Sequence, residues 1–283
     1  MGALASWIGR EERASDRLGA PLAHRWLATF DLPPRDKGHL PQGIHWCLCV
    51  PETATARIGP DGHPLRDGDP ASFLPPVPAP RRMWAGSALT FLAPVAIGAA
   101  IERISRIEAI EQKLGASGGL TFVTLRQETL ADGTPAVIEQ QTLVYRDPPQ
   151  PGSPPMPPVL SAALFDESGW DAVERITPGL PLLFRYSALT FNTHRIHYDA
   201  DYVREVELYR GPVVHGPLTA SLLLQLAAQA FGENRLKRFT FRGTSPAVAG
   251  EELVLAMRGP ADAIVLGAFA ADGRQVMKAE AAS

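Results

Sequence analysis

The stretch PLTASLLLQLAAQAF, from Pro217 to Phe231, decides the fold because it runs for fifteen residues without a charged side chain. Leucine and alanine occur on every side of a helix drawn through it, and a helix that is apolar all round is buried. Gly216 and Pro217 are typical of a helix start, with Gly216 predicted as the N-cap, and Gly232 is typical of a helix end. The sequence therefore predicts one central, buried helix.

Strand-like segments lie on both sides of this helix. Phe239 and Phe241 alternate with polar residues, which is the period of a half-buried strand, and Ala271-Asp272-Gly273 predicts a hairpin turn. The strands predicted in this region are residues 182–190, 236–242, 252–258, 263–270 and 274–280. A buried helix followed by antiparallel strands indicates a sheet wrapped around a helix.

The first part of the chain repeats this order in a degraded form. An amphipathic helix is predicted first, over residues 16–30, and strands over 88–94, 118–128 and 136–146. Residues 101–112 are ambiguous. Isoleucine recurs there at every third position, which favours a helix, but isoleucine is β-branched, which favours a strand. Periodicity alone leaves both alternatives open.

A proline-rich stretch divides the chain. Seven of the eleven residues in 148–158 are proline, which favours an extended linker. We therefore predict an N-terminal module over 1–147 and a C-terminal module over 159–283. A second proline-rich stretch, 33–80, contains turn signals such as Asp67-Gly68 and enough aromatic side chains to be ordered, irregular structure.

Composition excludes several classes of protein. The 283 residues are 45% hydrophobic and carry a net charge of −3, so a packed core is expected and nucleic acid is not an expected partner. No apolar run is long enough for a membrane span, and Glu11 and Glu12 interrupt any export signal. With only Cys47 and Cys49, the chain cannot build a disulfide framework. We expect a cytoplasmic protein.

Two segments gather polar, reactive side chains beside apolar structure: YSALTFNTHRIHYDAD at 186–201 and GPVVHGPL at 211–218. Asn192 and His197 lie five residues apart, and histidine can carry a proton near neutral pH. The amides of Gly216 and Leu218, at the helix start, could stabilise a carbonyl oxygen that gains negative charge. The alternative at this point is that the sequence around Gly216 only caps a structural helix.

Histidines and arginines allow two further kinds of site. A zinc ion could be bound by three histidines close in sequence, although no His-Glu-x-x-His pattern is present: His194, His197 and His215. A carboxylate or phosphate could be held by three arginines: Arg81, Arg82 and Arg195.

The second half of the chain resembles a MaoC-like hydratase domain, which has the hotdog fold. That family carries Asp-x-Asn-Pro-x-His, followed some twenty residues later by a His-Gly helix start. Here the stretch is Asn192 to His197, and the helix start is His215-Gly216. His197 matches the family's catalytic histidine and Asn192 stands where the catalytic aspartate is expected. His194 and Arg195 replace the usual asparagine and proline.

The departures resemble one branch, that of the 3-methylfumaryl-CoA (mesaconyl-CoA) and itaconyl-CoA hydratases with the mitochondrial 3-hydroxyacyl-thioester dehydratase. The stretches GPDGHP, FLPPVPAPRRMWAG, KLGASGGLTFVTL and VYRD in the first half also look like that branch. The resemblance covers nearly the whole chain. It implies an α+β double hotdog, with a degenerate first module, a catalytic second module and a strand at residues 101–112.

The implied reaction is the reversible addition of water to an enoyl-thioester. Since an amide has no useful basicity, we expect His197 to be the sole general base, Asn192 to hold the water and fix the His197 tautomer, and the Gly216 N–H to stabilise the enolate. The expected substrate is a branched dicarboxylic enoyl-CoA. Its expected binding residues are Arg195, His194, His215, Arg81, Arg82 and Leu218.

The resemblance implies no metal and no cofactor other than the coenzyme A of the substrate, and we expect a homodimer. Two alternatives stay open. One is a dehydratase of fatty acid synthesis acting on 3-hydroxyacyl-carrier protein, for which Lys237, Arg238 and Arg242 could form a basic entrance. The other is a non-catalytic acyl-thioester binding module, left by the loss of the aspartate.

Overall fold

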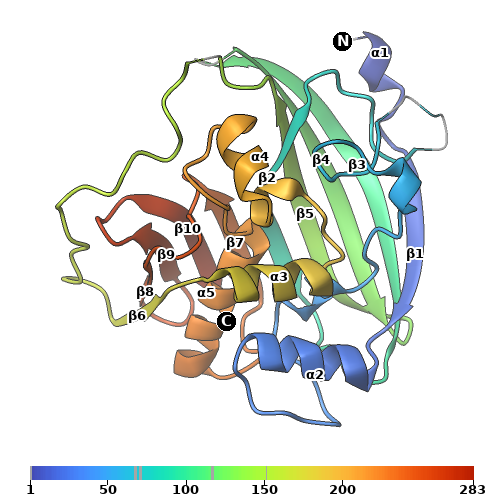
Figure 1. Ribbon diagram of the computed structural model, residues 1–283. Coiled ribbons are helices and arrows are strands. Elements are labelled where there is room, and N and C mark those ends of the chain that lie inside the picture. Colours follow the sequence, from blue (N-terminus) through green and yellow to red (C-terminus); the bar gives the residue numbers. More distant parts are fainter. Residues whose placement is uncertain (1, 67–68, 70–71, 116–117, 151) are drawn as a thin grey trace.

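The computed structural model describes residues 2–66, 69, 72–115, 118–150 and 152–283. The predicted turn at Asp67-Gly68 lies outside these residues, as does residue 151 of the predicted linker. The ten strands formed by these described residues make one antiparallel sheet with the order β1-β3-β4-β5-β2-β7-β10-β9-β8-β6 (Figure 1). The strands are β1 (Glu11–Arg17), β2 (Arg81–Phe91), β3 (Ala100–Gly115), β4 (Gly118–Ala131), β5 (Thr134–Arg146), β6 (Ala172–Ile176), β7 (Arg238–Gly243), β8 (Leu253–Arg258), β9 (Ile264–Ala270) and β10 (Gln275–Ala282).

The strand order has the same pattern on both sides of its centre, so the sheet consists of two five-stranded halves. They join where β2 pairs with β7, from Gly86 opposite Arg242 to Thr90 opposite Arg238. A Cβ atom at Gly86 would lie 2.2 Å from the carbonyl oxygen of Phe241. Only glycine therefore allows the two halves to approach this closely.

The predicted central helix is present as α5 (Gly216–Phe231). Nine of its residues are buried, and it contacts β8 and β9 of the second half and β2 of the first. Gly232, with φ of 94°, ends it. The N-cap is His215 and not Gly216, so Gly216 is already the first helical residue. This correction leaves the Gly216 amide as the first N–H without an acceptor inside the helix.

The remaining helices are short. They are α1 (Gly2–Ala5), α2 (Ala20–Thr29), α3 (Leu180–Leu189) and α4 (Ala200–Glu205), with 3-10 turns η1 (Ile44–Cys47), η2 (Thr55–Arg57) and η3 (Arg195–His197). The strand predicted over 182–190 is therefore wrong. A helix forms because Gly179 and Pro181 start it and Leu183, Tyr186 and Leu189 recur on one buried face.

The first half departs from its prediction in two ways. The helix predicted over residues 16–30 begins only at Ala20, because Asp16 and Arg17 pair with β3 as the end of β1. By element order, α2 corresponds to α3, since each follows the outer strand of its half. Between α2 and β2, where the counterpart of α5 would lie, the described residues of the first half form only the 3-10 turns η1 and η2.

The ambiguous residues 101–112 lie in β3, which pairs with β1 and β4, so the strand alternative is confirmed. The four strands predicted after the central helix are confirmed as β7 to β10, and the three others predicted in the first half as β2, β4 and β5. The described part of 148–158 runs along the outside of the molecule (Figure 1), where Met156 bridges to Tyr209. Among the described helices, none has the length and hydropathy that a membrane span requires.

Candidate active site

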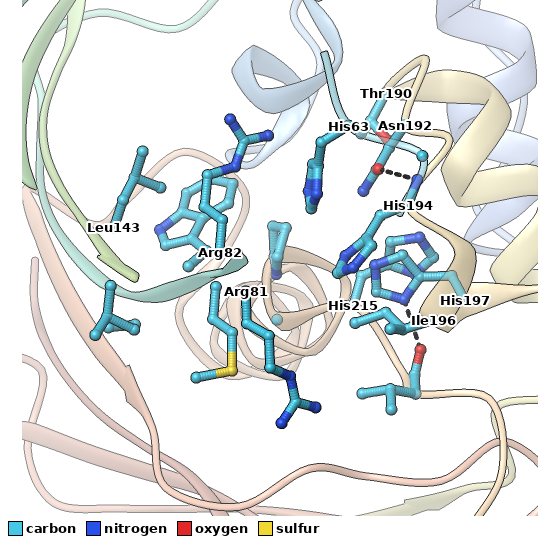
Figure 2. A pocket seen from close by; sticks show the side chains of 18 of the residues that line it. His63, Arg81, Arg82, Leu143, Thr190, Asn192, His194, Ile196, His197 and His215 are labelled. Atoms are coloured by element: carbon cyan, nitrogen blue, oxygen red, sulfur yellow. Dashed lines mark hydrogen bonds between the residues drawn. The ribbon is translucent and has the colours of Figure 1, made fainter. Parts of the chain in front are cut away.

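A cavity of about 2100 Å³ opens between the two halves of the molecule. The second half supplies the motif loop between α3 and η3 and the start of α5. The first half supplies β2 and the turn around Gly62. Figure 2 shows these groups facing one pocket: His63, Arg82, Asn192, His194, His197 and His215. The structure thus brings most of the predicted site residues together.

His197 lies at the end of η3 and is 7% exposed. Its Nδ1 lies 2.7 Å from the carbonyl oxygen of Val213, so Nδ1 carries the hydrogen and Nε2 has the free lone pair. Burial lowers the pKa of His197 to about 4, although the Val213 carbonyl acts in the opposite direction. The ring is therefore neutral near pH 7 and can accept a proton.

The imidazole of His215 packs against the imidazole of His197. The two imidazoles stack with centroids 3.5 Å apart and planes at 18°. His215 Nε2 lies 2.9 Å from Ser187 Oγ, and burial lowers the pKa of His215 well below its ordinary value. Because His215 also directly precedes Gly216, the stack holds His197 beside the N-terminus of α5. That N-terminus carries free amides and a partial positive charge.

Asn192 differs from its predicted role. Its Oδ1 accepts a hydrogen bond from the backbone amide of His194 at 2.9 Å, which closes the turn after α3. The Val213 carbonyl, not Asn192, fixes the tautomer of His197. Besides the NH₂ group, which only donates hydrogen bonds, Asn192 has one remaining lone pair on its neutral Oδ1.

His63 and Asp61 are functional candidates that the sequence analysis missed. The His63 ring lies 4.0 Å from the His194 ring, and Nδ1 of His63 lies 2.9 Å from Asp61 Oδ2. Burial and the nearby Arg82 lower the pKa of His63 to about 4, while Asp61 acts to raise it. Both residues belong to GPDGHP, the only signal in the sequence that could have pointed to them.

The turn that carries His63 is fastened to the motif loop. Thr193 Oγ1 donates to the Gly62 carbonyl at 2.6 Å, and the Arg195 amide donates to the Asp61 carbonyl at 2.9 Å. Gly62 has φ of 88°, and a Cβ atom there would lie 1.8 Å from the Thr193 oxygen. The first half therefore contacts the motif loop through backbone groups that leave no room for a side chain.

Two predicted binding residues lie elsewhere. Arg195 donates through Nε and Nη2 to Asp199 Oδ2, at 2.9 and 2.7 Å, and through Nη1 to the Pro60 carbonyl. It does not border the cavity, which corrects its predicted contact with a substrate carboxylate. The Leu218 side chain is fully buried in the core and also does not border the cavity. Its backbone amide remains one of the first N–H groups of α5.

The two adjacent arginines of β2 have different surroundings. Arg81 forms a buried ion pair with Glu207 and also donates to the Glu207 backbone carbonyl at 2.8 Å. Arg82 borders the cavity, and its side chain makes no hydrogen bond or ion pair with another described residue. Of the two, Arg82 is therefore the cation that a bound anion can reach.

The zinc alternative built on three histidines is not formed. His197 Nδ1 and His215 Nε2 already bond to Val213 and Ser187. Among the residues with described side chains, the one group of potential ligand atoms within 4.8 Å of one another is Asp61, His63 and His194.

Comparisons with known proteins agree with this architecture. The family described as hydroxyacyl-thioester dehydratase type 2 matches residues 43–249. Mesaconyl-C(4)-CoA hydratase of Chloroflexus aurantiacus is 38% identical over 278 residues, 97% of this chain and 95% of that protein. The crystal structure of HtdX of Mycobacterium tuberculosis superimposes with a TM-score of 0.68 at 17% identity, covering 97% of this chain and all of that one.

A second solved structure tests the fold directly. A conserved protein of Mycobacterium tuberculosis, described as having a double hotdog fold, matches 97% of this chain and 95% of its own, with a TM-score of 0.54 at 14% identity. The predicted double hotdog is confirmed, with the addition that its two half-sheets are continuous through β2 and β7.

Proposed function

We propose that this chain, which belongs to the hydroxyacyl-thioester dehydratase type 2 family, is an acyl-CoA hydratase/dehydratase that adds water reversibly to an enoyl-thioester. As a member of a dehydratase family it is a hydro-lyase. The observation that carries the proposal is the juxtaposition of a neutral, buried His197 and the free N-terminus of α5 at one cavity.

In the proposed reaction, the oxygen of a bound water attacks Cβ of the conjugated double bond. As the new C–O bond forms, one proton of the water passes to His197 Nε2, and the π electrons move through Cα to the thioester oxygen. The enolate then collapses and takes the proton from His197 at Cα. Water is thereby added across the double bond, and the enzyme returns to its starting protonation state.

The thioester oxygen gains negative charge in this step, so stabilising that oxygen lowers the barrier. The Gly216 amide, freed by its position as first residue of α5, would donate to it, and the helix dipole adds to the effect. Removing one donor of this kind typically costs about 2.7–4 kcal/mol of transition-state stabilisation. Because α5 is buried in the core, this donor is held in place before substrate binds.

For the acyl group, we propose a short, branched dicarboxylic enoyl-CoA such as 3-methylfumaryl-CoA or itaconyl-CoA. The similarity to a mesaconyl-C(4)-CoA hydratase supports this choice. Arg82 supports it independently, since a cation that borders the cavity without a protein partner suits a second carboxylate.

The test is a panel of enoyl-CoAs, with and without a second carboxylate, followed through loss of the absorbance of the conjugated thioester. We expect the dicarboxylic substrates to react best, and Arg82→Gln to raise their KM about tenfold or more while sparing monocarboxylic chains, which serve as the internal control. A wild-type preference for monocarboxylic chains would overturn the acyl assignment. Binding without turnover of any thioester would overturn hydratase activity.

A further inference from the structure

We propose that His63, held by Asp61, supplies the second hydrogen-bond acceptor for the reacting water, in place of the carboxylate that the motif lacks at Asn192. This inference rests on the proposed function, since it concerns the water of that reaction. It assigns a catalytic contact to the first half of the chain, although the motif lies wholly in the second half.

The motif loop alone holds the reacting water less firmly than the family motif. A water that attacks carbon is best oriented when both of its hydrogens are accepted and one lone pair remains for the new bond. His197 accepts one hydrogen. Asn192 is a weaker acceptor for the other than the carboxylate of the family motif, because its neutral Oδ1 already accepts from the His194 amide and its NH₂ group only donates.

His63 has the free nitrogen that this arrangement needs. The hydrogen bond from His63 keeps the pKa of Asp61 below its ordinary value, although burial acts to raise it, so the carboxylate is ionised near neutral pH. Nδ1 of His63 therefore donates to Asp61, and Nε2 has the free lone pair. The side chain is only 13% exposed and borders the same cavity as His197.

The placement of His63 is fixed and close to the motif. Its ring lies 4.0 Å from that of His194, which in turn lies 5.5 Å from that of His197. Figure 2 shows that His63 and His194 both lie at the pocket, and Asn192 accepts a hydrogen bond from the His194 amide. The backbone bonds of the Gly62 turn hold this side chain against the motif loop.

The charged groups around His63 keep it a neutral acceptor. The positive charges of Arg82 and Arg66 disfavour protonation of the His63 ring, and the negative charge of Asp61 favours it. The ring therefore faces charges of both signs. In the reaction the water would donate one hydrogen to each imidazole. His197 takes its hydrogen as a proton when the C–O bond forms, and the hydrogen facing His63 stays on the product hydroxyl.

A bound metal is the competing use of the same atoms. Asp61, His63 and His194 have ligand atoms within 4.8 Å of one another. However, Asp61 Oδ2 already accepts from His63 Nδ1, and two arginines lie near enough to disfavour another cation. The metal is therefore an outcome of the test and not the proposal.

The first experiment compares His63→Gln with His24→Gln. His24 also pairs with an aspartate, Asp36 at 2.8 Å, but it lies on the surface and does not border the cavity, so it is a matched control. We expect His63→Gln to lower kcat about tenfold to a hundredfold. Melting temperature and the Kd of a saturated acyl-CoA should stay close to wild type, and His24→Gln should change nothing.

The second experiment tests the replacement of the carboxylate directly. Asn192→Asp restores the acceptor that the family motif normally provides, so it should recover at least tenfold of the lost kcat in a His63→Gln background. In a His197→Ala background it should recover nothing, because there the proton acceptor itself is missing. A purely structural role of His63 would show no such selective rescue.

Three results would overturn the inference. The first is a His63→Gln variant that keeps more than half of the wild-type kcat while His197→Ala is inactive; the hydratase proposal would then stand without this residue. The second is a failure of Asn192→Asp to rescue. The third is a chelator-treated enzyme that loses activity and regains it with zinc. A wild-type enzyme that hydrates no thioester would instead overturn the proposed function and this inference together.

Discussion

The two halves of the molecule have the same order of strands but use the centre of their sheets differently. In the second half the centre holds the sixteen-residue helix α5, and in the first half the described residues between α2 and β2 form only the 3-10 turns η1 and η2. The long helix provides buried amides at a fixed point. The short turns leave the first half to shape the cavity with β2 and the Gly62 turn. In the proposed mechanism, the second half supplies His197 and the Gly216 amide, and the first half supplies Arg82 and His63.

Each half also buries a polar cluster. In the first half, Glu139 accepts from Trp46 Nε1 at 3.1 Å and from Ser87 Oγ at 2.5 Å, with His45 Nε2 3.6 Å away. In the second half, His197 and His215 stack with one nitrogen each held by a hydrogen bond. The first cluster satisfies a buried charge, and the second keeps the lone pair of His197 Nε2 available at the cavity.

The largest expected effect is a difference in kcat between a variant of the His197 cluster and a variant of the Glu139 cluster. His197→Ala should lower kcat by about 10²–10⁴, because it removes the proton acceptor, with little change in secondary structure. His45→Ala should leave the kcat of the folded enzyme within about twofold, since His45 does not border the cavity. Turnover and circular dichroism of both variants check this, and more than a tenth of wild-type activity in His197→Ala would refute it.

For the free energy of unfolding, the larger loss is expected from the Glu139 cluster of the first half. Glu139→Ala leaves the Trp46 and Ser87 donors buried without their acceptor, which should lower the free energy of unfolding by about 3–5 kcal/mol. Glu108→Ala is the control, because Glu108 makes a single exposed bond to Gln140 and should cost less than about 0.5 kcal/mol. Urea unfolding measures both, and equal losses would refute the assigned role.

The sequence predicts the second half better than the first for a physical reason. An uncharged apolar run of fifteen residues is too long for a typical strand and is bounded by Gly216-Pro217 and Gly232, so α5 follows from the sequence pattern. The strand predicted at 182–190 is wrong because its hydrophobic residues also fit a helix, and the exposed Phe184 mimics strand alternation. The described residues of the first half have only η1 and η2 in place of a central helix, and such short turns leave no periodic signal.

The motif residues of the second half could likewise be predicted from the sequence, whereas His63 of the first half could not. His197, Asn192 and Gly216 lie close in sequence within one motif, so the chain itself brings them together. His63 lies 134 positions before His197. The contacts of the Gly62 turn with the motif loop join the two, and no pattern in either segment encodes those contacts. Arg195 lies inside the motif, but its predicted contact with the substrate carboxylate is wrong because the side chain pairs with Asp199. Residue spacing alone does not predict that ion pair.

Acid should lower the free energy of unfolding, because His63 and His197 are neutral in the folded chain. The pKa of His63 and of His197 is about 4 in the folded chain, against an ordinary value near 6.5. The folded state thus binds fewer protons than the unfolded state between these values, and its stability falls as the pH falls from 6.5 towards 4.

Between pH 7.5 and pH 5 each of these residues should remove about 2 kcal/mol from the free energy of unfolding. Urea unfolding at both pH values checks this. His63→Gln should lose less stability on acidification than wild type. A slope unchanged by His63→Gln would contradict the lowered pKa.

The contact between the halves can be tested at one atom. Gly62 and Gly98 both have positive φ, 88° and 97°, so alanine is strained at either by about 1 kcal/mol. At Gly98 nothing lies near the added Cβ, whereas at Gly62 it meets the Thr193 oxygen. Gly62→Ala should therefore lower kcat at least tenfold and Gly98→Ala should not. Equal activity of the two variants would show that the contact has no functional role.

The most direct test of the proposed mechanism is a crystal structure with the saturated acyl-CoA analogue of the substrate, which keeps the thioester carbonyl but has no double bond to hydrate. We predict the oxygen-bearing carbon of the analogue at the start of α5, with its oxygen about 2.7–3.1 Å from the Gly216 amide, and one ordered water between Cβ and the imidazoles of His197 and His63. An analogue whose reactive end lies in the cavity far from His197, or a water bonded to neither ring, would contradict it.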